Sequence, residues 1–372
     1  MGEWLHVTYR VRARAEEIAV RAQALALEQS VEMALEAVTN PWVRDHVAGR
    51  VETITRAHEH QPGEGDVYNV VVRLSAITVG ANPAQLLSML FGNVSLQPDV
   101  ELIDAVLPPS VLAAFEGPNH GIDGLRRLVG ARGRPLTCSA LKPQGAPTAE
   151  LAELCRCLAG AGVDIIKDDH GLADQTPAPF AERVRACQRA VLRSGTAAVY
   201  APSIVGSPRQ VAEYLSIAAA EGIRAVLIAP MVYGLPAFKE LTDDHPDLAF
   251  VSHPAFAGAG RMAPALLFGQ LFRLYGADAV IYPNYGGRFA YSAGQCAALA
   301  HAARAPWGGV RPALPVPAGG MSVDRVGEMA AFYGPDVMLL ISGDLLNGPD
   351  VGLRARRFVD AVAACAAQAA TT

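Results

Sequence analysis

The sequence predicts an α/β protein in which an N-terminal ferredoxin-like α+β domain precedes a C-terminal TIM (β/α)8 barrel. The chain has 372 residues, which is enough for two hydrophobic cores. Its first part mixes alternating, strand-like patterns with helical ones. From Arg134 onward, short apolar runs alternate with amphipathic stretches eight times. We therefore expect one domain at residues 1–115 and a second at residues 116–372.

The N-terminal part contains several segments with strand or helix periodicity. Leu5, Val7, Tyr9 and Val11 alternate with polar residues, as in a half-buried strand. Further strands are expected at residues 51–55, 67–74 and 100–106, and helices at about 15–28 and 83–91. Strands mixed with two helices indicate a compact sheet that is covered on one face.

The C-terminal part carries near-continuous apolar runs, which a sheet buried on both faces requires. These expected strands are residues 136–141, 163–167, 197–205, 225–229, 248–252, 279–282, 313–317 and 337–341. The helical candidates are residues 149–159, 179–192, 208–220, 263–275, 293–303, 323–332 and 351–369. Eight such units in about 240 residues match a TIM barrel. An open doubly wound sheet is the alternative, but no Gly-x-Gly-x-x-Gly follows the first strand.

Composition excludes several classes of protein. The formal net charge is −5 and no Lys/Arg-rich run occurs, so nucleic acid is not an expected partner. The first ten residues lack the pattern of a signal peptide, and no apolar run is long enough to span a membrane. The six cysteines show no disulfide framework. We expect a cytoplasmic protein with reduced thiols.

Polar and glycine residues follow six of the eight expected barrel strands, where such barrels place their chemistry. They are Lys142, Lys167–His170, Ser252 with His253, Asn284 with Arg288, Gly319 with Gly320, and Ser342 with Gly343 and Asp344.

The densest cluster is Lys167, Asp168, Asp169 and His170. Alternation along a strand places Lys167 and Asp169 on the same side. Asp oxygen and His nitrogen can hold a hard divalent cation, provided that Lys167 loses its charge. Carbamylation by carbon dioxide would convert Lys167 into an oxygen ligand. The alternative is a solvated turn in which Lys167 pairs with an Asp.

The remaining strand-end residues each have a functional and a structural interpretation. Lys142 could act as a general base next to a carbonyl, and His253 could orient a hydroxyl or shuttle a proton. The glycines at the last two strands could cradle a phosphate, and Arg288 could clamp a phosphate or carboxylate. Each also has a structural interpretation. The lysine and the arginine could be ordinary surface side chains, the histidine a core residue, and the glycines parts of tight turns.

Several motifs in order resemble one known family. FEGPNHGI (Phe115–Ile122), GRPLTCSALKP (Gly133–Pro143) and the segment Asp164–His170 are followed by His253, PAGG and ISGDLLNGP. Together they resemble the large subunit of RuBisCO, and specifically its RuBisCO-like (form IV) relatives, over nearly the whole chain.

The resemblance implies a set of roles. Lys142 would abstract or relay a proton, Lys167 would be a carbamylated ligand of Mg²⁺, and Asp169 a second ligand. His170 occupies the position of the third ligand, and the reaction would pass through an enolate or enediolate. Apart from the resemblance, the strand-end pattern assigns Gly319, Gly320, Ser342, Gly343 and Arg288 to binding of the substrate or its phosphate. EQS and FGN imply a homodimer in which Glu28 and Asn93 complete the partner's active site; no small subunit is expected.

Departures from the family pattern argue against carboxylation of ribulose bisphosphate. His170 replaces a glutamate, Gln144 replaces the second lysine of the first barrel strand, and Pro254 replaces a phosphate-binding arginine. The loop NYGGRFAYSAG after the sixth barrel strand contains no lysine, and Met33 and Ala34 stand where the family has Thr-Trp.

What remains is enolate chemistry on a substrate with one phosphate. We expect decarboxylation, or transcarboxylation with hydrolysis, of a 3-oxo sugar-acid phosphate of the 3-oxo-isoapionate 4-phosphate type. The alternative is an enolase or isomerase that acts on a methylthio-pentulose phosphate of methionine salvage. A non-catalytic binding protein is a third hypothesis, against which the joint presence of Lys142, Lys167 and Asp169 argues.

Overall fold

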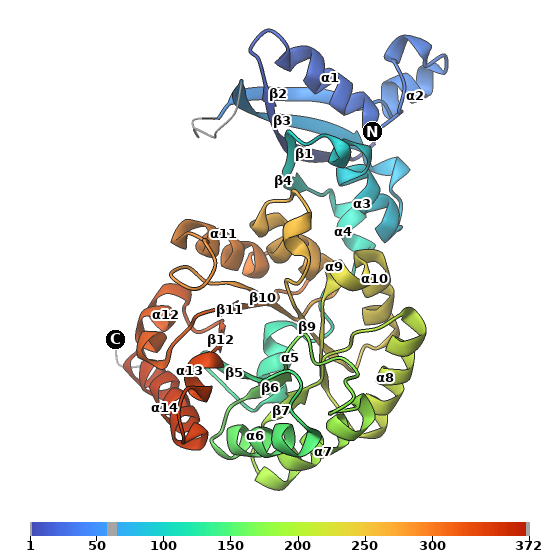
Figure 1. Cartoon of the computed structure of the whole chain (residues 1–372). Helices are drawn as coiled ribbons and strands as arrows, with labels where there is room; N and C mark the ends of the chain where they lie inside the picture. The colour runs from blue at the N-terminus through green and yellow to red at the C-terminus, as the bar shows by residue number, and fades with distance from the viewer. Residues whose placement is uncertain (1, 58–64, 370–372) are drawn as a thin grey trace. The chain divides into compact units, whose positions relative to one another are not determined.

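The computed structural model describes residues 2–57 and 65–369, and their contacts form two units (Figure 1). One unit comprises the chain up to Glu116 together with Gly258–Leu267 and Trp307–Val310. The other comprises Gly117–Ala257, Phe268–Pro306 and the chain from Arg311 onward. The domain boundary that the sequence suggested after residue 115 stays a prediction.

The first unit contains a four-stranded antiparallel sheet in the order β2-β3-β1-β4. Its strands are β1 (Trp4–Ala13), β2 (Arg50–Arg56), β3 (Asp66–Ser75) and β4 (Val100–Val106). The alternation that predicted β1 is confirmed, since Leu5, Val7, Tyr9 and Val11 are all buried. This strand order, with a helix after β1 and another after β3, is that of a ferredoxin-like fold.

Helices α1 (Ile18–Glu28) and α3 (Pro83–Phe91) are tied to this sheet and to each other. The Tyr9 hydroxyl of β1 donates to the carbonyl oxygen of Leu90 at 2.7 Å. The side chain of Gln29, the residue that follows α1, donates to the carbonyl oxygen of Met89 at 2.6 Å. The short helices α2 (Pro41–His46) and α4 (Pro109–Ala113) complete the unit. The hydrogen bonds of Tyr9 and Gln29 fix the end of α1, where Glu28 lies.

The second unit is a barrel of eight parallel strands surrounded by helices (Figure 1). The strands are β5 (Leu136–Leu141), β6 (Ile165–Asp168), β7 (Val199–Ala201), β8 (Ala225–Ile228), β9 (Ala249–Ser252), β10 (Ala279–Pro283), β11 (Leu314–Ala318) and β12 (Met338–Leu340). Hydrogen bonding joins them as β12-β5-β6-β7 and β8-β9-β10-β11. A parallel bridge between Ser203 and Leu227 connects the two groups on one side, and β11 contacts β12 on the other. The predicted fold class is confirmed.

The barrel interior is filled by apolar side chains at alternate positions of the strands. This core cluster includes Leu136, Cys138, Ile165, Val199, Ala225, Leu227, Ala249, Val251, Ala279, Ile281, Leu314, Val316, Met338 and Leu340. Every strand therefore sends every second residue inward, as the twofold periodicity of a strand requires. The barrel is packed solid, so a substrate can bind only at the ends of the strands.

The outer helices include most of those predicted from the sequence. They are α6 (Thr148–Gly160), α7 (Phe180–Ser194), α8 (Pro208–Ala220), α11 (Ala293–Arg304), α12 (Val326–Tyr333) and α14 (Val351–Ala369), with a π-helix at Ala265–Phe272. The sequence-based list lacked α10 (Leu235–Asp244), which lies between β8 and β9. Its short length and Pro236 in the first turn hide the helical period.

Two buried carboxylates organise the amino-terminal ends of the barrel strands. Asp164 accepts from both terminal nitrogens of Arg134, each at 2.7 Å, and from the backbone N–H of Thr137 at 2.8 Å. Asp278 accepts from the backbone N–H groups of His120, Gly121 and Phe250 at 2.6–2.7 Å. Asp278 thereby holds the start of α5 (Gly121–Leu128) against β9 and β10.

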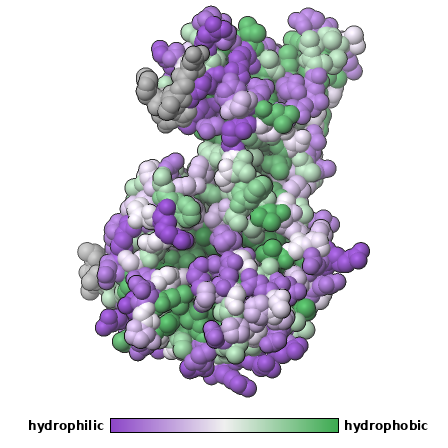
Figure 2. Space-filling view, viewed as in Figure 1, coloured by the Kyte–Doolittle hydropathy of each residue, from purple (hydrophilic) through white to green (hydrophobic). Residues whose placement is uncertain are grey.

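The surface of the second unit is mixed. In the space-filling view, hydrophilic residues cover much of its outer rim and hydrophobic patches lie nearer its middle (Figure 2). Across residues 2–57 and 65–369, no helix is long and apolar enough to cross a membrane.

Replacing Asp278 tests the anchoring of the barrel's amino-terminal end. Asp278→Ala leaves three buried N–H groups without an acceptor, so the free energy of unfolding should fall by roughly 3–5 kcal/mol. Asp278→Asn keeps one acceptor oxygen and should lose less. Urea denaturation measures both, with the exposed Asp360→Ala as a control that changes stability by less than about 0.5 kcal/mol. Equal losses for Asp278→Ala and Asp360→Ala would contradict this account.

Candidate active site

Four of the predicted site residues continue the inward-facing rows of the barrel strands. Lys167 lies two positions after Ile165, His253 two after Val251, and Ser342 two after Leu340. Lys142 lies four positions after Cys138 on β5. Since side chains alternate along a strand, all four belong on the inner side at the carboxyl end of the barrel. There these polar side chains lie next to the last layer of apolar side chains in the barrel interior.

Lys142 and Asp169 form the central polar contact of the site. The Lys142 Nζ atom donates to the Asp169 Oδ2 atom at 2.8 Å. The Gln144 amide donates to the same oxygen at 3.4 Å. A Cβ atom on Gly171 would lie 1.9 Å from the Gln144 amide nitrogen, so any larger residue there would displace this side chain from Asp169. Two side chains from the segment after β5 thus converge on one carboxylate.

Lys167 is almost completely buried, with 3% of its surface exposed. Its Nζ atom donates to the carbonyl oxygen of Asp168 at 2.8 Å. Burial lowers the pKa of this lysine, against the opposing effect of nearby anionic groups. The neutral amine is the form that reacts with carbon dioxide, so the surroundings of Lys167 favour carbamylation.

Asp169 remains ionised despite its partial burial. Burial by itself would raise the pKa of Asp169, but hydrogen bonds from His170 and Lys142 and the positive charge of Lys167 lower it well below its usual value. The Nδ1 atom of His170 lies 3.6 Å from the Asp169 Oδ1 atom. A permanent carboxylate is therefore available as a ligand or as a hydrogen-bond acceptor.

Asp168 points away from this cluster into a buried network that sequence reasoning missed. It accepts from the Arg183 Nε atom at 3.1 Å, the Tyr200 hydroxyl at 2.7 Å and the Ser203 backbone N–H at 3.0 Å. Burial raises the pKa of Asp168, and the charge of Arg183 opposes this shift. Alternation along β6 predicted that Asp168 faces the other way, but no local pattern identified its partners, which lie 15–35 positions away.

His170 and His253 stack on each other, with ring centroids 4.2 Å apart and planes inclined by 10°. The Nδ1 atom of His253 accepts from the Ala255 backbone N–H at 3.1 Å, which places the ring proton on Nε2. Burial and the charge of Lys167 lower the pKa of His253 to about 2. His253 is therefore neutral at any ordinary pH and can donate through Nε2.

The predicted phosphate-binding residues lie in the turns that follow β10, β11 and β12. Gly319 and Gly320 both have positive φ, at 86° and 95°, which glycine adopts readily. The carbonyl oxygen of Gly319 accepts from the backbone N–H of Arg288 at 2.9 Å. The Arg288 side chain is exposed, and its guanidinium lies 5.8 Å from the Phe289 ring. The β10 loop is thus attached to the glycine turn.

Ser342 and Gly343 lie where β12 leads into the short helix α13 (Gly343–Leu346). The Ser342 Oγ atom accepts from the backbone N–H of Ala140 at 2.8 Å, which leaves its own proton free to donate. Asn284, another strand-end residue, is fully buried. Its side chain accepts from the Tyr333 hydroxyl at 2.6 Å. Asn284 therefore stabilises packing around the β10 end.

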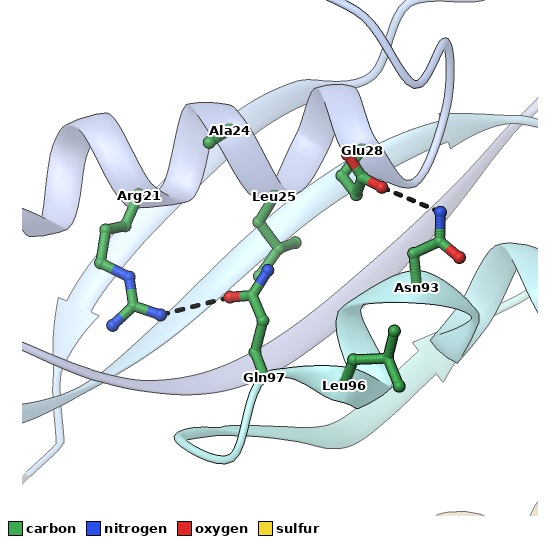
Figure 3. Close-up of a pocket in the computed structure, with 7 residues that line it drawn as sticks. All are labelled: Arg21, Ala24, Leu25, Glu28, Asn93, Leu96 and Gln97. Atoms are coloured by element: carbon green, nitrogen blue, oxygen red, sulfur yellow. Dashed lines mark hydrogen bonds between the residues drawn. The ribbon is translucent and has the colours of Figure 1, made fainter.

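Glu28 and Asn93 come together within the first unit. The Asn93 amide donates to the Glu28 Oε1 atom at 2.9 Å (Figure 3). They line a pocket of about 420 Å³ together with Arg21, Ala24, Leu25, Leu96 and Gln97. The two residues that the sequence assigned to a partner's active site thus form one polar pair at the surface.

A divalent cation fits this site only if Lys167 is carbamylated. Among residues 2–57 and 65–369, no three His, Cys, Asp or Glu side chains are grouped to hold a metal ion. Asp169 supplies a carboxylate and His170 an imidazole, and a carbamate on the buried Lys167 would supply the third ligand. The low pKa of Asp169 and the lowered pKa of Lys167 favour this set.

Comparison with known proteins gives close relatives, although no protein-family model matches the chain. The chain is 51% identical over 368 residues to ribulose bisphosphate carboxylase-like protein 1 of Rhodopseudomonas palustris, which covers 98% of each chain. It is 50% identical over 355 residues to 5-methylthioribulose-1-phosphate isomerase of Rhodospirillum rubrum, covering 94% of this chain and 93% of that protein. It is 30% identical over 364 residues to 2,3-diketo-5-methylthiopentyl-1-phosphate enolase of Geobacillus thermodenitrificans, covering 93% and 87%.

Solved structures agree with these relationships. A Rubisco-like protein from Rhodopseudomonas palustris superposes with a TM-score of 0.89 at 48% identity, covering 98% of each chain. An octameric ribulose-1,5-bisphosphate carboxylase/oxygenase from Pyrococcus horikoshii superposes with a TM-score of 0.88 at 26% identity, covering 98% of this chain and 88% of that one.

A ferredoxin-like unit followed by a (β/α)8 barrel, with lysine, carboxylate and histidine side chains at the strand ends, defines a barrel enzyme. The relatives that share this architecture over nearly their whole length are named as isomerases, enolases and RuBisCO-like proteins. The chain belongs to the family of RuBisCO-like proteins.

Replacing Arg183 tests whether its positive charge is needed to keep the buried Asp168 carboxylate stable in the fold. Both side chains are fully buried. Arg183→Met leaves the Asp168 carboxylate buried without a counter-charge, so the free energy of unfolding should fall by about 3–5 kcal/mol. The double variant Asp168→Leu/Arg183→Met removes both charges and should lose less than Arg183→Met alone. A double variant less stable than Arg183→Met would contradict this interpretation.

Proposed function

We propose that this enzyme isomerises a 5-methylthio-pentulose 1-phosphate through an enolate, with Lys142 as the proton-transferring group. The contact between Lys142 and Asp169 at 2.8 Å carries the proposal, because it holds an amine at the barrel end beside the candidate cation ligands. The 50% identity to a protein named 5-methylthioribulose-1-phosphate isomerase supports this class of substrate.

This proposal replaces the reaction that the sequence analysis preferred. Decarboxylation of a 3-oxo sugar-acid phosphate was inferred from His170, Pro254 and Arg288. The named relatives are instead an isomerase and enolases of methylthio-pentulose phosphates, which favours the alternative. Both reactions need an enolate next to a ketone, so the same residues serve either one. Loss of a bisphosphate contact at Pro254 agrees equally well with a substrate that has one phosphate.

The proposed mechanism assigns each residue one task. As a neutral amine, Lys142 removes a proton from the carbon next to the ketone and, as an ammonium, returns it to the other carbon of the enediolate. The hydroxyl proton passes from the oxygen of the new ketone to that of the old one, so that only the position of the ketone changes. Asp169 holds the Lys142 Nζ atom in place. His253, whose Nδ1 atom is occupied by Ala255, donates from Nε2 to a substrate oxygen. The buried floor of the barrel excludes water below the site.

Mg²⁺ is the proposed cofactor, held by Asp169, His170 and the carbamate of Lys167. When bound, it would polarise the ketone and stabilise the negative charge on its oxygen. Phosphate recognition is assigned to Gly319, Gly320, Ser342, Gly343 and Arg288. The free hydroxyl proton of Ser342 and the positive φ angles of both glycines agree with this role.

Glu28 and Asn93 are proposed to act in the active site of a partner subunit. They form a hydrogen-bonded pair at the surface of the first unit, where a second chain could approach. A relative by structure, the enzyme of Pyrococcus horikoshii, is described as octameric. A homodimer with shared sites is the smallest assembly that would use this pair.

Lys142→Met tests the proton-transfer step. Loss of a positioned general base lowers the rate by about 10²–10⁴-fold, so kcat for 5-methylthioribulose 1-phosphate should fall within that range. Deuterium uptake from D₂O, followed by NMR, should fall in parallel. Lys142→Arg is the matched control, since it keeps the charge beside Asp169 but stays protonated. Full activity in Lys142→Arg would assign Lys142 an electrostatic role only.

Carbon dioxide release from a 3-oxo sugar-acid phosphate, without isomerisation of the thio-sugar, would contradict the proposed isomerase and support the decarboxylase instead.

Carbamylation of Lys167 gives a second test. After divalent cations are removed, activity should be lost and should return with Mg²⁺ and bicarbonate together. Activation should rise with pH, because the neutral fraction of Lys167 rises with pH. With ¹³C-labelled carbon dioxide, the wild type should show a carbamate signal by NMR that Lys167→Arg lacks. Metal-independent activity without a carbamate signal would refute this part of the proposal.

A further inference from the structure

Phe256 is an unusual residue in the turn that follows His253. Its φ angle is 65°, and 69% of its surface is exposed. The turn is closed by a hydrogen bond from the backbone N–H of Ala257 to the carbonyl oxygen of Pro254 at 3.1 Å. The Ala255 N–H is held by His253. Phe256 is therefore fixed at a defined place beside a candidate catalytic histidine.

The conformation of Phe256 costs free energy that packing does not recover. A positive φ is strained for an aromatic residue and is normally left to glycine. Among the residues that the structure covers, Glu32 is the other non-glycine residue with a positive φ. An exposed aromatic ring gains little from burial within its own chain. A strained residue next to a catalytic group points to a functional contact.

The residues that directly follow β8 and β9 carry no charged side chains. Strands β8 and β9 are parallel neighbours, so their following loops lie side by side at the carboxyl end of the barrel. After β8 come the short helix α9 (Pro230–Tyr233) and the start of α10, and residues 229–238 and 252–257 contain no Lys, Arg, Asp or Glu. The next cations along the chain are engaged elsewhere, since Lys239 pairs with Asp243 and Arg261 donates to the carbonyl oxygens of Val100 and Gln97. Val232 in α9 is 58% exposed, so an apolar group would find Val232 and Phe256.

The charged groups of the site come from other strands. Lys142 follows β5, and Lys167 and Asp169 belong to or follow β6. Arg288 follows β10, which pairs with β9, and its guanidinium lies over the Phe289 ring. In the barrel order, β5 and β6 are separated from β9 by β7 and β8 on one side and by β10, β11 and β12 on the other. A substrate that spans the barrel end would therefore meet Lys142, Lys167 and Asp169 at one end and the apolar side chains after β8 and β9 at the other.

We infer that Phe256, with Val232, forms the apolar wall that receives the alkylthio end of the substrate and determines specificity for it. This inference rests on the proposed isomerase function. A thioether sulfur packs favourably against an aromatic ring, and burial of its methyl group adds to the preference. The turn that follows the strand-end histidine thus recognises the end of the sugar that carries no phosphate.

Phe256→Gly tests the wall without endangering the fold, because glycine adopts a φ of 65° without strain. The measurement is kcat/KM for 5-methylthioribulose 1-phosphate and for 5-deoxyribulose 1-phosphate, which lacks the thioether. An apolar contact of this size changes specificity by about tenfold. The ratio of the two kcat/KM values should therefore fall about tenfold in Phe256→Gly. Phe256→Leu should retain part of the preference, and the thermal midpoint of Phe256→Gly should not decrease.

Leu192→Ala is the matched control, since Leu192 is an exposed apolar residue of the outer helix α7. Its substrate ratio should equal that of the wild type. An unchanged ratio in Phe256→Gly, with an active wild type, would overturn the inference and leave the isomerase intact. A shift in oligomeric state by sedimentation, with an unchanged ratio, would make Phe256 an interface residue instead. A wild type that converts neither compound would overturn the proposed function and this inference with it.

Discussion

The candidate site depends on the strict alternation of side chains along β6. Lys167 and Asp169 face the barrel end, while Asp168 between them faces the outer helices. Arg183, Tyr200 and Ser203 hold Asp168 in a dry network, and both members of the Asp168–Arg183 pair are fully buried. This network pins the carboxyl end of β6. A slip of one residue would exchange the two faces, so it would turn Lys167 and Asp169 toward the outer helices and Asp168 into the barrel.

The protonation states of the site residues are set by a small number of charged side chains that lie close together and are largely shielded from water. Asp169 is the one permanent carboxylate that faces both Lys142 and the buried Lys167. Its negative charge offsets the positive charge of either lysine. Burial, together with the charge of Lys167, lowers the pKa of His253 and keeps it neutral. The site therefore offers an amine, a carboxylate and an uncharged imidazole donor, the set that proton transfer next to a ketone requires.

Decarboxylation and isomerisation share an enolate intermediate, so the residues that stabilise it do not reveal which reaction takes place. His170, Pro254 and Arg288 suggested a sugar acid, but an enolate is common to decarboxylation and isomerisation. Residues that stabilise the intermediate cannot by themselves distinguish the two reactions. Discrimination must come from groups that contact the unreactive end of the substrate, and we propose that Val232 and Phe256, after the neighbouring strands β8 and β9, are such groups.

The sequence by itself determined the two-part architecture, because apolar periodicity reports directly which faces of strands are buried. It also determined which residues end the barrel strands, and it placed Lys167 and Asp169 on one side. It missed α10, whose period is hidden by its short length and an early proline. Only the tertiary structure decided that Asp168 pairs with Arg183, that His170 stacks on His253, and that Gln144 reaches Asp169 over Gly171. These contacts join residues from different loops and helices. Their geometry is set by the closure of the barrel, which no local pattern of residues encodes.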